Sequence, residues 1–149
     1  MKTKFMMQTI VGMCCLAMAF GCATSGGGTA KTKAAAGGDE KTAITKMLGE
    51  WSSALASKDV NKIMPFYSDS FKNDEGMDKA GMQELIAGAI SQGYLDGAKV
   101  DVASAQVSVN GEEAVVAPVN LSGDMGALSL SFSLKKEAGT WRIASSRQA

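Results

Sequence analysis

The histidine and cysteine content limits the chemistry that this chain can carry out. Its 149 residues include no histidine, and the three cysteines, Cys14, Cys15 and Cys22, all lie near the amino terminus. Histidine is the commonest general base and metal ligand near neutral pH. The residues after Cys22 therefore contain no thiol nucleophile, no disulfide and no cysteine- or histidine-based metal site. We predict no metal and no cofactor, and we expect lipid attachment as the chemistry of Cys22.

Cys22 follows a segment typical of export signals. A short basic start precedes an uncharged stretch over residues 5–20, which is shorter than the roughly 20 residues that a membrane-spanning helix needs. This pattern predicts a signal peptide over residues 1–21. The segment Ala19–Cys22 resembles a bacterial lipobox, which would make Cys22 the lipidated first residue. Alternatively, Ala17–Ala19 fits the A-x-A pattern of ordinary signal peptidase, which would release a free protein.

The residues after Cys22 favour the lipid anchor. Gly, Ala, Thr and Lys dominate up to residue 38, and no large apolar residue is present. Such a segment buries too little surface to offset its ordering entropy, so we predict a flexible tether over residues 22–38. Ala23 directly after the cysteine, in place of Asp, is typical of lipoproteins sorted to the Gram-negative outer membrane. We expect an exported chain, anchored by lipid and facing the periplasm.

The remaining residues, 39–149, predict one small domain that does not bind nucleic acid. The chain has 15 basic and 15 acidic residues, and four of the basic ones precede residue 39, which leaves 11 against 15 in the domain. Nucleic-acid binding needs a clustered basic patch that displaces counterions. No such cluster is present in this mildly acidic segment.

Apolar spacing predicts three helices in the first half of the domain. A stripe at intervals of three and four residues predicts a helix over residues 39–57, with Asp39 as its cap. Asp59 can cap a second, shorter helix, which Pro65 interrupts. Asp78 can start a third helix that ends at Gly93. The stripe of the first helix consists of Ile44, Met47, Leu48, Trp51 and Leu55.

From Lys99 onward the apolar period changes to two, which predicts strands. A phase slip near residues 103–104 predicts a β-bulge, and Asn110-Gly111 predicts a hairpin. Pro118 places its strand at an edge or at a local break. Residues 137–140 form a turn before the final strand. We therefore predict an α+β fold in which three amino-terminal helices pack into a curved antiparallel sheet.

Three motifs resemble the nuclear transport factor 2-like superfamily, the cone fold also found in ketosteroid isomerase and SnoaL-like polyketide cyclases. Trp51, with Ala54-Leu55 and Lys58-Asp59 after it, is similar to the first-helix pattern of that family. Residues 63–71 resemble the exit of its second helix, and residues 139–143 resemble its last strand. The likeness covers residues 39–149. It implies a cone with a pocket and often a dimer, but it implies no particular reaction.

Enzymes of this superfamily place an acid, a base or a hydrogen-bond donor deep in the cone. The candidates here are Tyr67, Asp69, Asp101 and Arg142. Asp69 lies between two serines, which predicts a polar turn. Asp101 and Arg142 have the parity opposite to the apolar residues of their strands, so we expect both side chains to face solvent. A solvated carboxylate is a poor base at neutral pH, and we therefore predict no catalytic residue.

Two further residue sets leave alternatives open. The aromatic residues can line a ligand pocket or fill the core of the cone. The serines of one strand can form a homodimer interface or a solvated face. The aromatic set is Trp51, Phe66, Tyr67, Phe71 and Trp141, and the serine set is Ser129, Ser131 and Ser133.

The sequence as a whole predicts a non-catalytic envelope lipoprotein. Its domain would bind a small apolar ligand or present a surface to a partner in the envelope. One alternative is an isomerase- or cyclase-type enzyme that uses Asp and Tyr in the cone. Another is a structural protein whose cone is filled by its own side chains.

Overall fold

The computed structural model of the chain describes residues 36–123 and 126–149. The predicted signal peptide, Cys22 and most of the predicted tether lie outside the described residues. No helix in the described part of the chain is both long enough and apolar enough to span a membrane.

The first helix, α1 (Ala36–Ala56), begins three residues before the predicted start. Asp39 therefore lies in the first turn of α1 and not at the cap position. In the first turn its carboxylate still interacts favourably with the helix dipole. The predicted apolar stripe is buried along its whole length. The start of α1 also takes in the last residues of the range that we assigned to the tether.

The other two helices begin at the predicted caps. The Asp59 carboxylate accepts a hydrogen bond from the Asn61 amide at the start of α2 (Val60–Ile63). Asp78 accepts one from the Gly81 amide at the start of α3 (Lys79–Ser91). Pro65 lies in a 3-10 turn, η1 (Met64–Phe66), so α2 is only one turn long. Gly93 follows α3 with a φ of +75°, the left-handed conformation that ends many helices.

Six strands form one mixed sheet in the order β1-β6-β5-β4-β2, with β3 also paired to β4. The predicted antiparallel arrangement holds for five of them, whereas β1 runs parallel to β6. No strand was predicted for the β1 segment. The strands are β1 (Tyr67–Asn73), β2 (Lys99–Asp101), β3 (Gln106–Asn110), β4 (Glu113–Gly123), β5 (Gly126–Glu137) and β6 (Thr140–Gln148).

Two irregularities were predicted, and one of them takes a different form. The expected bulge at residues 103–104 is instead a full interruption, because β2 and β3 are separate strands that pair with successive parts of β4. The second irregularity surrounds Pro118. β4 is an interior strand, and its ladder with β5 shifts register between Val116 and Val119. Pro118 therefore marks a local break and not a sheet edge.

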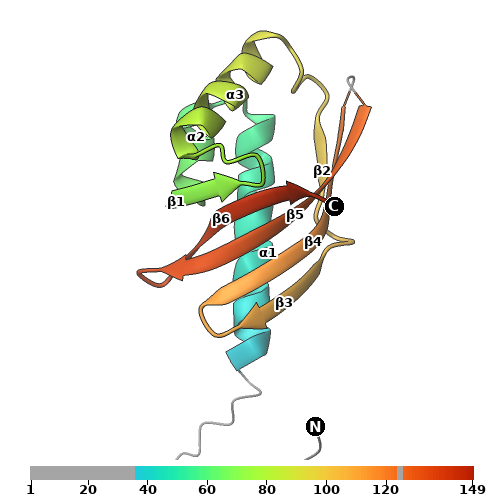
Figure 1. Ribbon diagram of the computed structural model, residues 1–149. Helices are drawn as coiled ribbons and strands as arrows, with labels where there is room; N and C mark the ends of the chain where they lie inside the picture. Colours follow the sequence, from blue (N-terminus) through green and yellow to red (C-terminus); the bar gives the residue numbers. More distant parts are fainter. Residues whose placement is uncertain (1–35, 124–125) are drawn as a thin grey trace, which may run out of the picture. The chain divides into compact units, whose positions relative to one another are not determined.

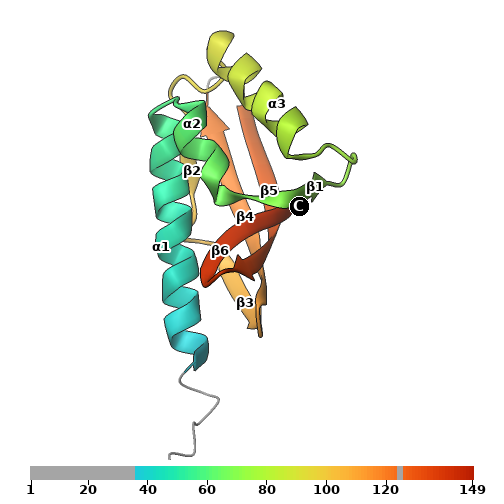
Figure 2. The same ribbon diagram turned by 90° about the vertical axis from the view of Figure 1, so that its left-hand side faces the viewer.

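α1 lies along one face of the curved sheet, and α3 lies over one end of it (Figures 1 and 2). The core fills the space between α1 and the sheet, where the Trp51 ring meets the Phe132 ring edge to face at 5.2 Å. In both views α3 is at the end of the domain where α1 ends, and the first turn of α1 is at the opposite end. The predicted α+β cone is confirmed.

Candidate functional site

A cavity of about 430 Å³ lies between α3 and the sheet. α1, β1, α3, β4, β5 and β6 all contribute to its wall, which is mostly apolar. Trp51, Tyr67 and Phe132 are the buried aromatic residues of this wall. The remaining apolar lining residues are Leu55, Met82, Leu85, Ile86, Ala89, Leu95, Leu121, Leu128 and Leu130.

Large apolar side chains are exposed at the rim of this cavity. Leu85 of α3 is 53% exposed and Leu128 of β5 is 39% exposed. The apolar spacing of Met82, Leu85 and Ile86 in the sequence predicts that Leu85 is buried. The side chain is exposed because the cavity separates this part of α3 from the sheet. Polar lining residues complete the wall and are Asn73, Asp74, Glu75, Ser146, Arg147 and Gln148.

Two polar groups belong to the aromatic wall of the cavity. The Trp51 indole nitrogen Nε1 is buried, and no group of the described residues pairs with it. The Tyr67 hydroxyl lies beside this indole. Burial raises the pKa of Tyr67 to about 12, although a weak hydrogen-bonding contact with the Trp51 indole opposes this effect. That contact lies outside the geometry of a formed hydrogen bond, so the indole nitrogen still lacks a full partner. At neutral pH the hydroxyl therefore keeps its proton and remains a hydrogen-bond donor.

The structure divides the five aromatic residues that sequence analysis grouped together. Trp51 and Tyr67 line the cavity, and Phe71 packs behind them with its ring edge to face on Tyr67 at 5.0 Å. Phe66 and Trp141 instead line a separate surface hollow of about 390 Å³. The aromatic residues therefore serve two places, which sequence spacing could not distinguish.

Trp141 is fixed by a carboxylate from the first turns of α1. Its indole Nε1 donates to Glu40 Oε2 at 2.7 Å, and Lys136 Nζ donates to Glu40 Oε1 at 2.5 Å. These two hydrogen bonds hold the pKa of Glu40 below its ordinary value, and the bond from Lys136 contributes most. This cluster ties α1 to the β5–β6 hairpin. No local sequence pattern predicts this cluster, because Glu40 and Trp141 are 101 residues apart.

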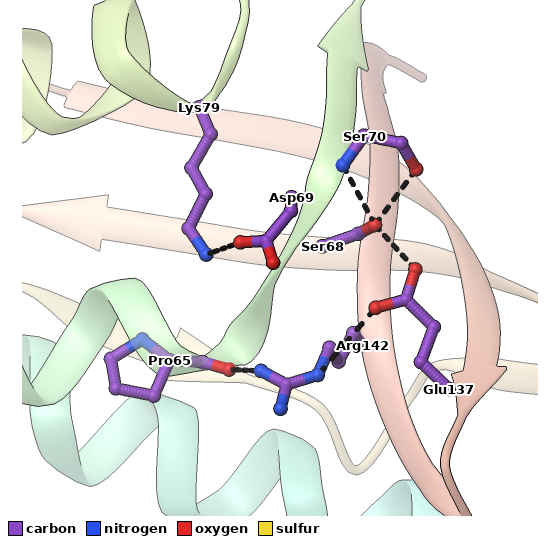
Figure 3. A network of polar contacts seen from close by, with 7 residues as sticks. All are labelled: Pro65, Ser68, Asp69, Ser70, Lys79, Glu137 and Arg142. Atoms are coloured by element: carbon purple, nitrogen blue, oxygen red, sulfur yellow. Dashed lines mark hydrogen bonds and ion pairs between the residues drawn. The ribbon is translucent and has the colours of Figure 1, made fainter.

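Asp69 lies on strand β1 and not in the predicted turn (Figure 3). Its side chain is 96% exposed and accepts a hydrogen bond from Lys79 Nζ at 2.6 Å. This contact lowers the pKa of Asp69. A carboxylate with a lowered pKa is a weak base. Asp69 is also absent from the cavity wall.

Arg142 faces solvent only in part, because its side chain is 34% exposed and is held by two neighbours. Its guanidinium donates to the Pro65 carbonyl and pairs with Glu137 at 3.6 Å. Ser68 is fully buried. Its hydroxyl donates a hydrogen bond of 2.6 Å to the same Glu137 carboxylate. Figure 3 shows that Ser68 and Asp69 point to opposite sides of β1. We interpret this network as a clamp between β1 and the β5–β6 hairpin.

Asp101 is exposed, as its strand parity predicted. Its carboxylate accepts a hydrogen bond from the Ser104 hydroxyl at 2.6 Å and from the backbone amides of Ser104 and Ala103. These bonds lower the pKa of Asp101, with the Ser104 side chain contributing most. Asp101 thus stabilises the turn between β2 and β3.

Comparison with known proteins connects this arrangement to solved structures. No known family profile matches the sequence, and no curated protein matches it. The fold is similar to a cystatin-like protein of unknown function from Nostoc punctiforme, with a TM-score of 0.60 and 14% identity over 72% of this chain and 88% of that one. An NTF2-like protein of unknown function from Shewanella baltica has a TM-score of 0.58 and 18% identity over 72% of this chain and 90% of its own.

A third similar structure is an NTF2-like protein with a cystatin-like fold from Novosphingobium aromaticivorans. Its TM-score is 0.61, and it is 14% identical over 80% of this chain and 89% of that one. The chain has the NTF2-like cone fold. The resemblance stated from the sequence is therefore confirmed for the fold, and these identities carry nothing about a reaction or a ligand.

The serine face of this NTF2-like cone is not uniformly solvated. Ser131 is buried, Ser133 is exposed, and the Ser129 hydroxyl donates to the Asn120 side chain. A homodimer through this face stays a prediction. Within residues 36–123 and 126–149, no three acidic, histidine or cysteine side chains converge to hold a metal ion.

Proposed function

We propose that this domain binds a small apolar molecule in its cone cavity and holds it without chemical change. We further propose that lipidated Cys22 keeps the domain at the outer membrane, facing the periplasm. The observation that carries the first proposal is the cavity itself. Its volume of about 430 Å³ and its mostly apolar wall resemble ordinary small-molecule sites, which measure roughly 300–1,000 Å³ and contain few polar groups.

The apolar rim supports entry of such a ligand. Leu85 and Leu128 line the cavity and remain substantially exposed. Exposed apolar groups next to a cavity are typical of binding sites. A ligand that covers these side chains removes their surface from water, at roughly 25 cal/mol per Å² of apolar surface. Burial of the rim would therefore contribute to affinity.

The placement of the acidic residues supports binding over catalysis. Asp69 and Asp101 do not line the cavity, and both have lowered pKa values. The acidic residues among the described lining, Asp74 and Glu75, belong to an exposed turn after β1. An isomerase-type enzyme needs a base within hydrogen-bond reach of its substrate. None of these carboxylates is buried in the apolar wall, where its pKa would rise towards neutrality.

The position of α3 is compatible with the proposed anchor. α1 has 21 residues, and a helix of that length extends for about 30 Å. The predicted tether joins the start of α1, whereas α3 and the cavity beside it are at the end of the domain where α1 finishes (Figure 2). A lipid on Cys22 would leave the cavity accessible from the periplasm.

A pair of tryptophan substitutions on α3 tests the binding proposal. Ala89 lines the cavity, and Ala87 on the same helix is exposed. Ala89→Trp fills the cavity and should weaken binding of the uncharged dye N-phenyl-1-naphthylamine at least about tenfold, or 1.4 kcal/mol. Ala87→Trp makes the same substitution towards solvent and should leave binding unchanged. Absence of dye binding by the wild-type chain, or equal binding by all three chains, would overturn the proposal.

A further inference from the structure

We propose that the cone cavity takes a long, linear aliphatic chain, whose end lies outside the cone in a second hollow at the tip of the β4–β5 hairpin. The second hollow has a volume of about 210 Å³. The inference rests on the proposed function, because the chain enters the same cavity. It adds the ligand class, which is a molecule with an unbranched hydrocarbon chain and not a compact ring system.

The two hollows meet at three leucines. Leu95, Leu121 and Leu128 belong to the walls of both. Leu121 of β4 and Leu128 of β5 are paired across the sheet, and Leu95 lies in the segment that follows α3. None of these residues is charged. A chain that leaves the cavity between them therefore passes over apolar side chains all the way to the second hollow.

The wall of the second hollow suits a narrow hydrocarbon. No charged residue is present among the described residues that line it, and its polar side chains are those of Tyr94 and Ser122. A hydrocarbon can lie there without taking a charged group out of water, which would be costly. Most of the remaining residues are small and leave room for a chain. These small residues are Ala98, Gly123, Gly126 and Ala127.

Exposed apolar side chains follow the same path. Four large apolar side chains of the described residues are substantially exposed, and three of them line these hollows. Leu85 lines the cavity, Tyr94 lines the second hollow, and Leu128 lines both. Contiguous exposed apolar surface is typical of binding sites. A linear chain that runs from the cavity across Leu128 covers all three, whereas a compact ligand inside the cone leaves Tyr94 uncovered.

Two uncharged alcohols of different shape test the inference. 1-Tetradecanol is a linear chain, and 1-adamantanol is a compact cage. Equilibrium dialysis of the radiolabelled alcohols against the purified full chain measures both dissociation constants. Ala127 is exposed, lines the second hollow and does not line the cavity. Ala127→Asp places a carboxylate in the path of the chain. It should weaken binding of 1-tetradecanol about tenfold, the effect of losing roughly two buried methylene groups, and leave binding of 1-adamantanol unchanged.

A matched control makes the same substitution elsewhere. Ala103 is an exposed residue between β2 and β3 and lines neither hollow, so Ala103→Asp should bind both alcohols as the wild type does. Far-ultraviolet circular dichroism checks that both variants fold.

The outcomes separate this inference from the proposed function. Unchanged binding of 1-tetradecanol by Ala127→Asp, or equal weakening of both alcohols, would overturn the linear chain and leave the proposed function intact. A wild type that binds only the compact alcohol would also overturn the linear chain. Failure of both alcohols to bind the wild type would contradict the proposed function itself.

Discussion

Replacement of each tryptophan by phenylalanine tests whether the Trp51 indole lacks a partner. Trp51 and Trp141 are 2% and 4% exposed, so burial alone predicts similar losses on substitution. Their polar environments differ, because Trp141 donates to Glu40 and Trp51 Nε1 has no partner in the described structure. We therefore expect Trp51→Phe to be much the milder of the two substitutions.

The magnitude follows from two contributions to the free energy of unfolding. Loss of ring volume costs about 1 kcal/mol at either position, as for modest changes in core volume. Trp141→Phe also loses a hydrogen bond to a charged group, which adds about 1.5–3 kcal/mol. Trp51→Phe instead removes a buried donor that has no partner. The free energy cost of leaving that donor unpaired, about 1–3 kcal/mol, disappears and offsets the loss of ring volume. The expected loss is about 3 kcal/mol for Trp141→Phe, whereas Trp51→Phe should range from no change to a gain of about 2 kcal/mol.

Urea unfolding followed by far-ultraviolet circular dichroism measures both losses without using tryptophan fluorescence. With a typical slope of about 1–3 kcal/mol per M, Trp141→Phe should lower the midpoint by about 1–3 M. The midpoint of Trp51→Phe should lie at or above that of the wild type. If Trp51→Phe lowers the midpoint as much as Trp141→Phe does, the Trp51 indole is paired in solution and the reasoning is refuted.

Three further predictions concern pH, the acidic residues and the anchor. The pKa of Tyr67 is about 12 in the folded chain and 10.0 ordinarily, so the free energy of unfolding of the wild type should fall by about 2–3 kcal/mol between pH 10 and pH 12. Tyr67→Phe should lose less stability over the same pH range, and a loss equal to that of the wild type would contradict the raised pKa. Asp69→Asn and Asp101→Asn should leave binding of N-phenyl-1-naphthylamine unchanged, and a tenfold loss in either would show that a carboxylate contributes to the site. Cys22→Ser should move the chain from the membrane fraction to the soluble fraction, and retention in the membrane fraction after a high-salt wash would contradict the lipid anchor.

The features that the sequence predicted correctly depend on local signals. The stripe of α1, the Asp59 and Asp78 caps and the stop at Gly93 each involve residues within a few turns of one another. The hairpin at Asn110-Gly111 is also local, although the structure places the loop one residue later, at residues 111–112. Such elements are determined by periodicity and capping, which a single sequence displays.

Strand β1 was missed because its residues favour a turn. Asp and Asn are poor strand formers and Ser favours turns, and these three residue types supply four of the seven residues of Tyr67–Asn73. Pairing with β6, whose residues lie more than 70 positions away, overrides that preference. The clamp formed by Ser68, Glu137 and Arg142 depends on the same pairing, so sequence analysis could not predict it.

The candidate site was predicted only in part for a similar reason. Aromatic content indicated that Trp51 and Tyr67 belonged to a pocket or to the core, and both line the cavity. Phe66 and Trp141 gave the same signal, yet they lie at a different surface hollow. Their separation depends on how α1 and η1 pack on the sheet. The unpaired Nε1 of Trp51 is equally invisible in a sequence, because it is defined by neighbours distant along the chain.

The most direct test of the central claim is to locate a bound apolar molecule by nuclear magnetic resonance. Intermolecular Overhauser effects with N-phenyl-1-naphthylamine identify the side chains that the dye contacts. A ligand bound in the cone should contact the methyl groups of Met82, Ile86 and Leu130, which line the cavity. Contacts confined to Phe66 and Trp141, or the absence of any contact at saturating dye, would contradict a ligand site in the cone.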